Sequence, residues 1–288
     1  MTKNILVIGG AGFVGSNLCK RLNSPNINVC SYDNYFTGNK LNHHKGIEYF
    51  KGESKNINEI DFGYEFDIVY HLGEYSRVEQ SFEDIDKVFD FNMSSIYNIL
   101  KFVKNNNAKI VYAGSSTKFG DDGNNILESP YAWTKKTNAE LVKTYCSWFD
   151  LEYCITYFYN VYGQNEIAEG PYATLIAKYI NLYKSGVRRL PVVKPGLQRR
   201  NFTHIEDITE ALVILGENGL GDNYGIGSDK SFSIIEIVEL FKCEVEWLPE
   251  RKGNRMSAPI VSEKTKSLGW KVKNELLDYI SENIKDES

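Results

Sequence analysis

Short apolar segments alternate with longer segments of helical periodicity over the first 160 residues. Apolar runs with no polar face are typical of strands buried in a parallel sheet. Such runs predict strands at residues 5–8, 28–32, 47–52, 67–72, 109–113 and 153–159. Between them, apolar residues spaced three and four apart predict helices at residues 12–23, 84–104 and 130–149. This alternation predicts an α/β fold with a doubly wound parallel sheet, covered by helices on both faces.

The second half of the chain is less regular. Its pattern predicts helices at residues 172–185, 206–216 and 231–241 and short strands at 201–205 and 223–227, with a loop rich in Pro, Gly and Arg at 186–200. We therefore expect a larger domain made of residues 1–165 and about 201–228. A smaller α/β lobe, interleaved with it, would contain about 166–200 and 229–288.

Charge and composition narrow the function classes. The 288 residues carry 33 Lys and Arg against 38 Asp and Glu, a formal net charge of −5. This balance argues against non-specific nucleic-acid binding, which needs a basic surface. No apolar run approaches the ~20 residues that span a bilayer. The five scattered cysteines and the histidines show no metal-ligand spacing, so we expect a cytoplasmic protein with neither disulfides nor a metal site.

Three glycines follow the first predicted strand and open the first helix. Gly9, Gly12 and Gly15 permit a tight turn and a close approach of the backbone to a pyrophosphate, which the helix N-terminus would then bind. Asp33 ends the second predicted strand, where a carboxylate accepts hydrogen bonds from a ribose 2′-hydroxyl and repels a 2′-phosphate. The pattern predicts a Rossmann-type domain that prefers NAD, with NADP as the open alternative.

Candidate catalytic residues lie after the fifth strand and on the next helix. Tyr131 and Lys135 are four residues apart and share one helix face. A protonated lysine beside a phenol favours the phenolate, which can exchange a proton with an alcohol or ketone. Ser115 and Ser116 follow a strand at the edge where ligands bind in open α/β sheets, although turn chemistry is an alternative role for both.

Together these motifs resemble the extended short-chain dehydrogenase/reductases, and in particular nucleotide-sugar epimerases of the UDP-glucose 4-epimerase type. The resemblance covers essentially the whole chain. The residues that carry it are Gly9, Gly12, Gly15, Asp33, His71-Leu72-Gly73, Asn92, Ser115-Ser116-Thr117, Tyr131, Lys135, Asn160-Val161-Tyr162-Gly163, Gln198-Arg199-Arg200-Asn201-Phe202, Glu250-Arg251-Lys252-Gly253-Asn254 and Leu268-Gly269-Trp270.

The resemblance implies roles for individual residues. Tyr131 would be the acid and base, Lys135 would tune it, and Ser115 would assist. The implied cofactor contacts are Gly9, Gly12, Phe13, Val14, Gly15, Asp33, Asn34, Glu53, Leu72, Gly73, Asn92, Tyr131, Lys135 and Tyr159. The implied substrate contacts are Ser115, Ser116, Thr117, Asn160, Arg200, Arg251 and Glu74, with the two arginines on the diphosphate.

The residues after Ser115 favour one reaction within this family. Family dehydratases have Thr-Asp-Glu where this chain has Ser115-Ser116-Thr117, and the decarboxylases have Glu in place of Thr117. Elimination of water needs an acid and a base that hydroxyls do not supply. The interpretation is an NAD-dependent epimerase that acts on a nucleotide-diphosphate sugar, with C4 as the expected carbon. A nucleotide-sugar reductase or dehydrogenase is the alternative, and a non-catalytic NAD-binding protein is less favoured.

Three further features bear on substrate and assembly. Glu74 replaces a small apolar residue of the family, so it either enters the pocket or pairs with Arg77. Residues 166–200 hold seven Lys and Arg against two Glu, which favours a small anionic ligand there. The predicted helices 84–104 and 130–149 are apolar on more than one face, which predicts a homodimer through this helix pair.

Overall fold

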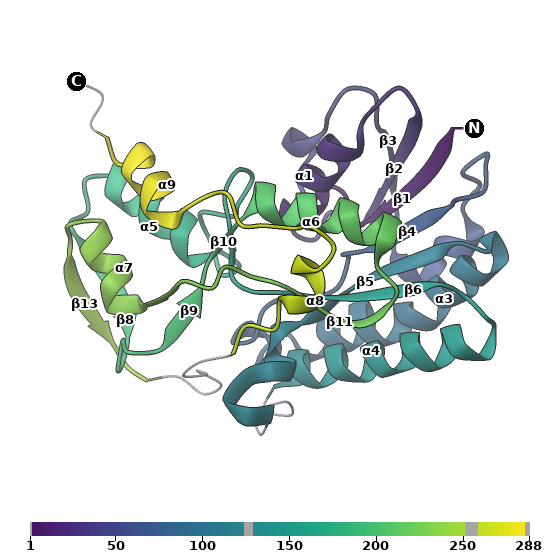
Figure 1. Cartoon of the computed structure of the whole chain (residues 1–288). Helices are drawn as coiled ribbons and strands as arrows, with labels where there is room; N and C mark the ends of the chain where they lie inside the picture. The colour runs from purple at the N-terminus through teal and green to yellow at the C-terminus, as the bar shows by residue number, and fades with distance from the viewer. Residues whose placement is uncertain (1, 124–128, 251–258, 286–288) are drawn as a thin grey trace.

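Seven parallel strands form the central sheet of the molecule. The computed structural model describes residues 2–123, 129–250 and 259–285. Within them the strand order is β11-β6-β5-β4-β1-β2-β3, which confirms the predicted doubly wound fold (Figure 1). The strands are β1 (Lys3–Ile8), β2 (Ile27–Asp33), β3 (Glu48–Lys51), β4 (Ile68–His71), β5 (Lys109–Ser115), β6 (Tyr153–Phe158) and β11 (Gly221–Ile226).

Helices cover both faces of this sheet because each strand presents apolar side chains on both sides. One face packs against α1 (Phe13–Leu22) and α6 (Ile205–Asn218), and the other packs against α3 (Ser94–Asn106) and α4 (Pro130–Trp148) (Figure 1). The order in which strands are added reverses between β1 and β4, which are parallel neighbours in the sheet. Ligands bind at such a reversal point, beyond the carboxyl ends of the strands.

The predicted helix 84–104 is interrupted. The structure has α2 (Ile85–Val88), then a π-helical turn at Phe89–Met93, then α3. Asn92 lies in this turn with its side chain fully buried. Its amide accepts a hydrogen bond from the backbone of Tyr75 at 2.8 Å and donates one to the hydroxyl of Thr134 at 2.9 Å. The wider turn brings Asn92 to face these partners, as is common for π-helical turns near functional sites.

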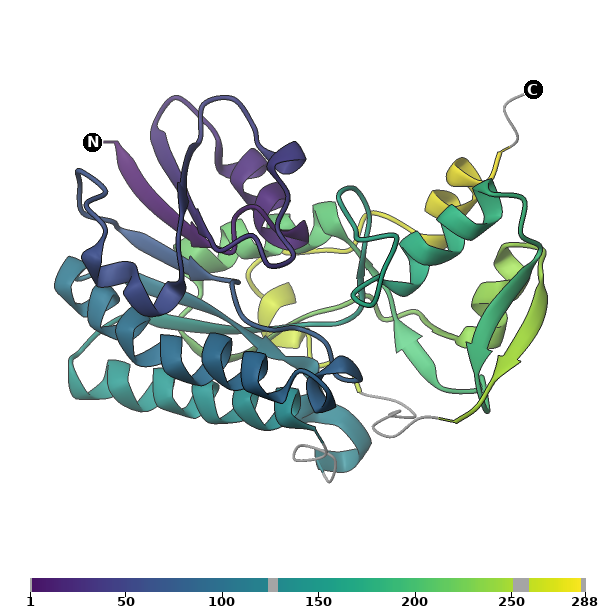
Figure 2. The same ribbon diagram turned by 180° about the vertical axis from the view of Figure 1, so that it is seen from behind.

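A smaller lobe lies beyond the carboxyl edge of the sheet (Figure 2). Its core is built around Tyr179, Leu190, Ile237 and Phe241. The predicted loop 186–200 is wrong in part, because Arg189–Val193 form strand β8, which pairs in parallel with β13 (Glu244–Leu248). The lobe contains α5 (Leu175–Lys184), β8 (Arg189–Val193), β9 (Arg199–Asn201), β12 (Ser231–Ser233), α7 (Ile234–Leu240), β13 (Glu244–Leu248) and α9 (Leu276–Asn283).

The end of the chain crosses back from this lobe to the sheet. Between β6 and α6 lie the paired short strands β7 (Val161–Tyr162) and β10 (Thr203–His204), and α8 (Glu263–Lys266) packs beside β11. Trp270 is fully buried in the core cluster that contains β1 and α6. The assignment of all residues 229–288 to the smaller lobe is therefore corrected for the stretch around Trp270, because its indole needs the deeper apolar core.

Within the described residues, no helix is both long and apolar enough to cross a bilayer. All five cysteines are free thiols, and four of them are buried.

Asp207 holds this returning segment in place. Its backbone carbonyl accepts the indole N–H of Trp270 at 2.8 Å. Its carboxylate accepts the backbone N–H groups of Lys273 and Asn274, at 3.2 and 3.1 Å, and the side-chain amide of Asn274 at 2.9 Å. The side chain is almost fully buried, so these donors would have no replacement partner if it were removed.

We expect Asp207→Ala to lower the free energy of unfolding by on the order of 2–3 kcal/mol, because it leaves these backbone donors unsatisfied. The melting temperature should fall by about 5 °C in a thermal scan. Glu206→Ala is the matched control, because Glu206 is an exposed neighbour whose ion pair with Arg21 is worth under about 1 kcal/mol. Equal losses in the two variants would contradict this account of Asp207.

Candidate active site

A cavity of about 580 Å³ lies between the carboxyl edge of the sheet and the smaller lobe. The loops after β1, β4, β5 and β6 line it from the sheet side, and residues of α5, β9 and α7 line it from the lobe. Most of the predicted site residues meet here, namely Gly9, Gly12, Phe13, Val14, Gly15, Asp33, Asn34, Leu72, Gly73, Glu74, Ser115, Ser116, Thr117, Tyr131, Lys135, Tyr159, Asn160 and Arg200.

The glycine loop has no room for side chains. A Cβ on Gly15 would lie 2.0 Å from the carbonyl oxygen of Gly9, and a Cβ on Gly9 would lie 2.8 Å from the backbone of Gly73. Gly9 also has a φ of +84°, which favours glycine. Helix α1 starts directly after Gly12 with no side chain capping it, so its first N–H groups face the cavity without a side-chain acceptor. These features fit a dinucleotide pyrophosphate.

Asp33 joins this loop to the end of β2. Its carboxylate accepts the backbone N–H of Ala11 at 2.9 Å and that of Tyr35 at 2.7 Å. Burial raises the pKa of Asp33 above its ordinary value, and hydrogen bonds from the backbone of Tyr35, Ala11 and Gly12 offset only part of this rise. The side chain therefore orders the loop and also presents a carboxylate at the cavity, where a ribose hydroxyl of the cofactor would bind.

Two predicted cofactor contacts lie outside the cavity lining. Asn92 is buried in the π-helical turn, where its side-chain amide forms hydrogen bonds with Tyr75 and Thr134. Glu53 accepts a hydrogen bond from the side chain of Asn34 at 3.1 Å. Both residues support groups at the cavity rather than line it, and their direct contact with the cofactor stays a prediction. Arg251 lies outside the described residues.

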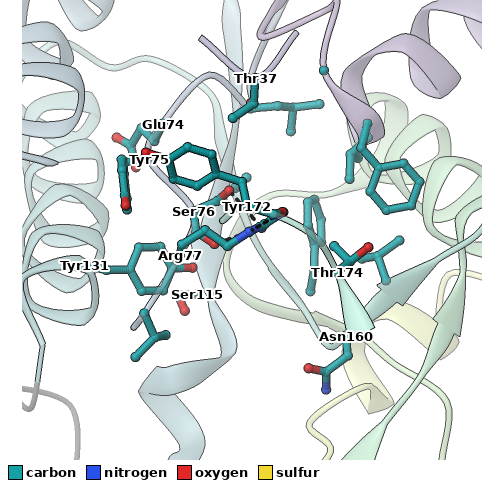
Figure 3. Close-up of a pocket in the computed structure, with 18 of the residues that line it drawn as sticks. Thr37, Glu74, Tyr75, Ser76, Arg77, Ser115, Tyr131, Asn160, Tyr172 and Thr174 are labelled. Atoms are coloured by element: carbon teal, nitrogen blue, oxygen red, sulfur yellow. Dashed lines mark hydrogen bonds between the residues drawn. The ribbon is translucent and has the colours of Figure 1, made fainter. Parts of the chain in front are cut away.

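The catalytic candidates meet at the centre of the cavity. Figure 3 shows Tyr131 and Ser115 close together beside Arg77. Tyr131 lies in the first turn of α4, which Ser129 caps by accepting the backbone N–H of Ala132 at 3.1 Å. Ser115 ends β5 and accepts the hydroxyl of Thr117 at 2.9 Å. The arrangement brings a phenol and a hydroxyl to one point, where both can bind one substrate oxygen.

Lys135 lies one turn further along α4 and is almost fully buried. Its ammonium donates to the carboxylate of Glu74 at 2.7 Å and to the backbone carbonyl of Ala113. The hypothesis that Glu74 pairs with Arg77 is therefore wrong. Arg77 instead donates through Nε and Nη2 to the carbonyl of Tyr172, at 3.0 and 2.6 Å.

Three charged residues that line the cavity, Arg77, Glu79 and Glu166, were not predicted as site residues. Arg77 was considered only as a partner for Glu74, yet it lines the cavity, interacts electrostatically with Tyr131 and points its guanidinium toward Tyr172 (Figure 3). Glu166 accepts the backbone N–H of Gly163 at 3.1 Å, and burial raises its pKa to about 7. Arg77 and Glu166 lie in irregular loops. The hydrophobic periodicity that predicts helices and strands does not predict the course of such loops.

The profile of the NAD dependent epimerase/dehydratase family matches residues 5–227. The chain belongs to this family. The match confirms the family resemblance and the expectation that NAD is the cofactor.

Relatives in this family catalyse more than one reaction. The chain is 30% identical to "Putative UDP-glucose 4-epimerase" of Methanocaldococcus jannaschii, with 96% of this chain and 95% of that protein covered. It is 28% identical to dTDP-D-glucose 4,6-dehydratase of Mus musculus, with 94% and 84% covered. The structure of UDP-glucose 4-epimerase from Thermotoga maritima, determined with UDP-glucose, has a TM-score of 0.90 at 21% identity, covering 98% and 97% of the two chains, and shares the fold.

We expect Gly15→Ala to weaken cofactor binding about ten-fold or more, because the new methyl group collides with the Gly9 carbonyl and opens the loop. NAD released on denaturing the purified protein measures the effect. Gly12→Ala is the graded control, since its Cβ would lie 3.3 Å from the same oxygen, and it should retain more cofactor. If Gly15→Ala retained as much NAD as the wild-type protein, the loop would not be what binds the cofactor.

Proposed function

We propose that this member of the family is a 4-epimerase of a nucleotide-diphosphate sugar. The observation that carries the proposal is the set of side chains at the centre of the cavity. Tyr131 and Ser115 face one point, and the positions after Ser115 hold the hydroxyls of Ser116 and Thr117 rather than a carboxylate pair. Proton exchange at one oxygen is thus supported better than elimination.

The chain's own residues would act on the sugar hydroxyl and its ketone. NAD supplies a hydride acceptor and donor when bound. Tyr131 would take the proton of the C4 hydroxyl while Ser115 binds the same oxygen, and with the C4 hydride accepted by the cofactor the product would be a 4-keto sugar. Once the ketone has turned its other face, return of that hydride to C4 and of the proton from Tyr131 would give the inverted configuration.

The smaller lobe would bind the nucleotide diphosphate. Arg200 lines the cavity on β9, in the basic stretch that runs from residue 166 to residue 200. Arginine suits phosphate oxygens because its planar fork donates several N–H groups. Asn160 donates to the carbonyl of Asn201 at 3.2 Å, which ties the loop after β6 to the strand that carries Arg200.

An assay with a panel of UDP-, GDP-, CDP- and dTDP-sugars tests the reaction, followed by NMR and by absorbance at 340 nm. Epimerisation forms a stereoisomer with no net change in absorbance. Stoichiometric consumption of NAD(P)H would instead establish a reductase, and a 4-keto-6-deoxy product a dehydratase. Binding without turnover over the whole panel would favour a non-catalytic protein.

Tyr131→Phe should lower kcat by about 10²–10⁴-fold, because it removes the proton-exchanging hydroxyl. NAD content should be unchanged, which separates chemistry from cofactor binding. Tyr183→Phe, in the smaller lobe, is the control and should retain full activity. Wild-type turnover by Tyr131→Phe would remove Tyr131 from this role.

We also propose that the protein is a cytoplasmic homodimer that associates through α2, α3 and α4. Large apolar side chains on these helices and their ends are exposed, namely Ile85, Phe89, Tyr97, Trp133, Trp148 and Phe149. Phe89 stacks on Trp133, and Tyr145 contacts both Trp148 and Phe149, so the aromatic surface continues from one helix to the next. Contiguous apolar surface of this kind is typical of an interface.

The double variant Tyr97→Lys with Trp148→Lys should halve the mass measured by light scattering at micromolar concentration, because it buries two charges in the interface. Trp247→Lys is the control, since Trp247 is similarly exposed but lies on β13 of the smaller lobe. A monomeric mass for the unmodified protein would refute the dimer.

A further inference from the structure

A buried carboxylate lies directly behind the catalytic candidates. Glu74 follows β4, where the family resemblance leads us to expect a small apolar residue, and its side chain is only 1% exposed. It turns away from the centre of the cavity, toward the inner face of α4. One carboxylate oxygen, Oε2, accepts the Lys135 ammonium at 2.7 Å. The ion pair therefore lies at the wall of the cavity, behind the reactive end of the site.

Every side of this carboxylate has a partner. Oε2 also accepts the hydroxyl of Tyr112 at 2.7 Å. Oε1 accepts the side-chain amide of Asn138 at 2.8 Å and lies 3.3 Å from Nε2 of His71. These partners come from β4, β5 and α4, so Glu74 ties the helix that carries Tyr131 to two central strands. Both carboxylate oxygens are engaged by protein groups, and the contact of Glu74 with the substrate stays a prediction.

The charge of Glu74 persists despite its burial. Burial alone would raise the pKa of the Glu74 carboxyl, but the charge of Lys135 and the neighbouring His71 lower it to about 2. The buried pair is therefore a carboxylate and an ammonium at working pH. A lone lysine beside Tyr131 would present a full positive charge to the phenol, whereas here a negative charge lies 2.7 Å from that ammonium.

Resting on the proposed function, we propose that Glu74 is a positioning residue, which holds the Lys135 ammonium in place and offsets its charge at Tyr131. The enzyme then works at a higher pH than a Tyr–Lys pair without the carboxylate would. The other titratable groups that face the pair are His71 on β4, Tyr112 on β5 and Tyr131 on α4. Arg77, in the loop after β4, also interacts electrostatically with Tyr131.

Glu74→Gln tests the proposal because it removes the charge and keeps hydrogen-bonding groups. The acid limb of the kcat–pH profile should move about one pH unit lower, since the Lys135 charge then favours the phenolate without opposition. Glu74→Asp keeps the charge and should return the limb toward the wild-type position. Glu83→Gln, an exposed neighbour on the same stretch, is the control and should leave the profile unchanged.

Glu74→Ala is the second variant, because it places at this position a small residue of the kind that the family resemblance leads us to expect. It should move the limb in the same direction as Glu74→Gln. A limb that stays in place or moves to higher pH in folded, NAD-loaded variants would overturn the proposal, even if kcat falls, because a merely structural role lowers the rate without that shift.

A spectroscopic measurement separates this inference from the proposed reaction. The ultraviolet absorbance of ionised tyrosine, taken as the difference between each protein and its Tyr131→Phe counterpart, follows the phenolate of Tyr131 without any substrate. With Glu74→Gln the signal should appear at lower pH. If no nucleotide sugar turns over but the signal shifts, the proposed function fails and the role of Glu74 stands. If turnover is found and the signal does not shift, the role of Glu74 fails alone.

Discussion

The loops after β1 and β4 approach each other closely at their backbones. These neighbouring strands end at the same edge of the sheet, and a single added carbon at Gly9 would lie 2.8 Å from Gly73. The approach brings the helix start at Gly12 beside the loop that carries Glu74 and Arg77. The glycine loop after β1 and the hydrogen-bond network around Glu74 therefore meet at this contact. Only glycine permits the approach in both loops.

Segments that run between the central sheet and the smaller lobe fix the position of the lobe, which forms the other side of the cavity. The chain leaves the sheet after β6, builds the smaller lobe, and returns so that Trp270 is buried against β1 and α6. Asp207 accepts hydrogen bonds from Trp270 and Asn274 in the returning segment. Arg77 supplies another link, from the loop after β4 to the carbonyl of Tyr172. The position of Arg200 relative to Tyr131 thus depends on contacts on both sides of the cavity.

Local patterns predicted the parts of the site that short segments determine. The glycine loop, Asp33 and the Tyr131–Lys135 pair each depend on a strand end or on one helix face, so spacing suffices to find them. The direction of Glu74 does not follow from spacing, because it depends on where Asn138 and Tyr112 lie after packing. The pairing of β8 with β13 joins segments about 55 residues apart, and Arg77 and Glu166 reach the cavity from loops. These features are products of tertiary structure.

The π-helical turn sets the rotational phase of the helices around it. An α-helix turns by about 100° per residue, so one residue more or less in this turn would rotate α3 by that angle relative to α2. Asn92 would then leave Tyr75 and Thr134, and Tyr97 would leave the aromatic surface it shares with Tyr145. A single backbone irregularity therefore keeps the inner face of this helical stretch in register with the cavity and its outer face in register with the exposed aromatic surface.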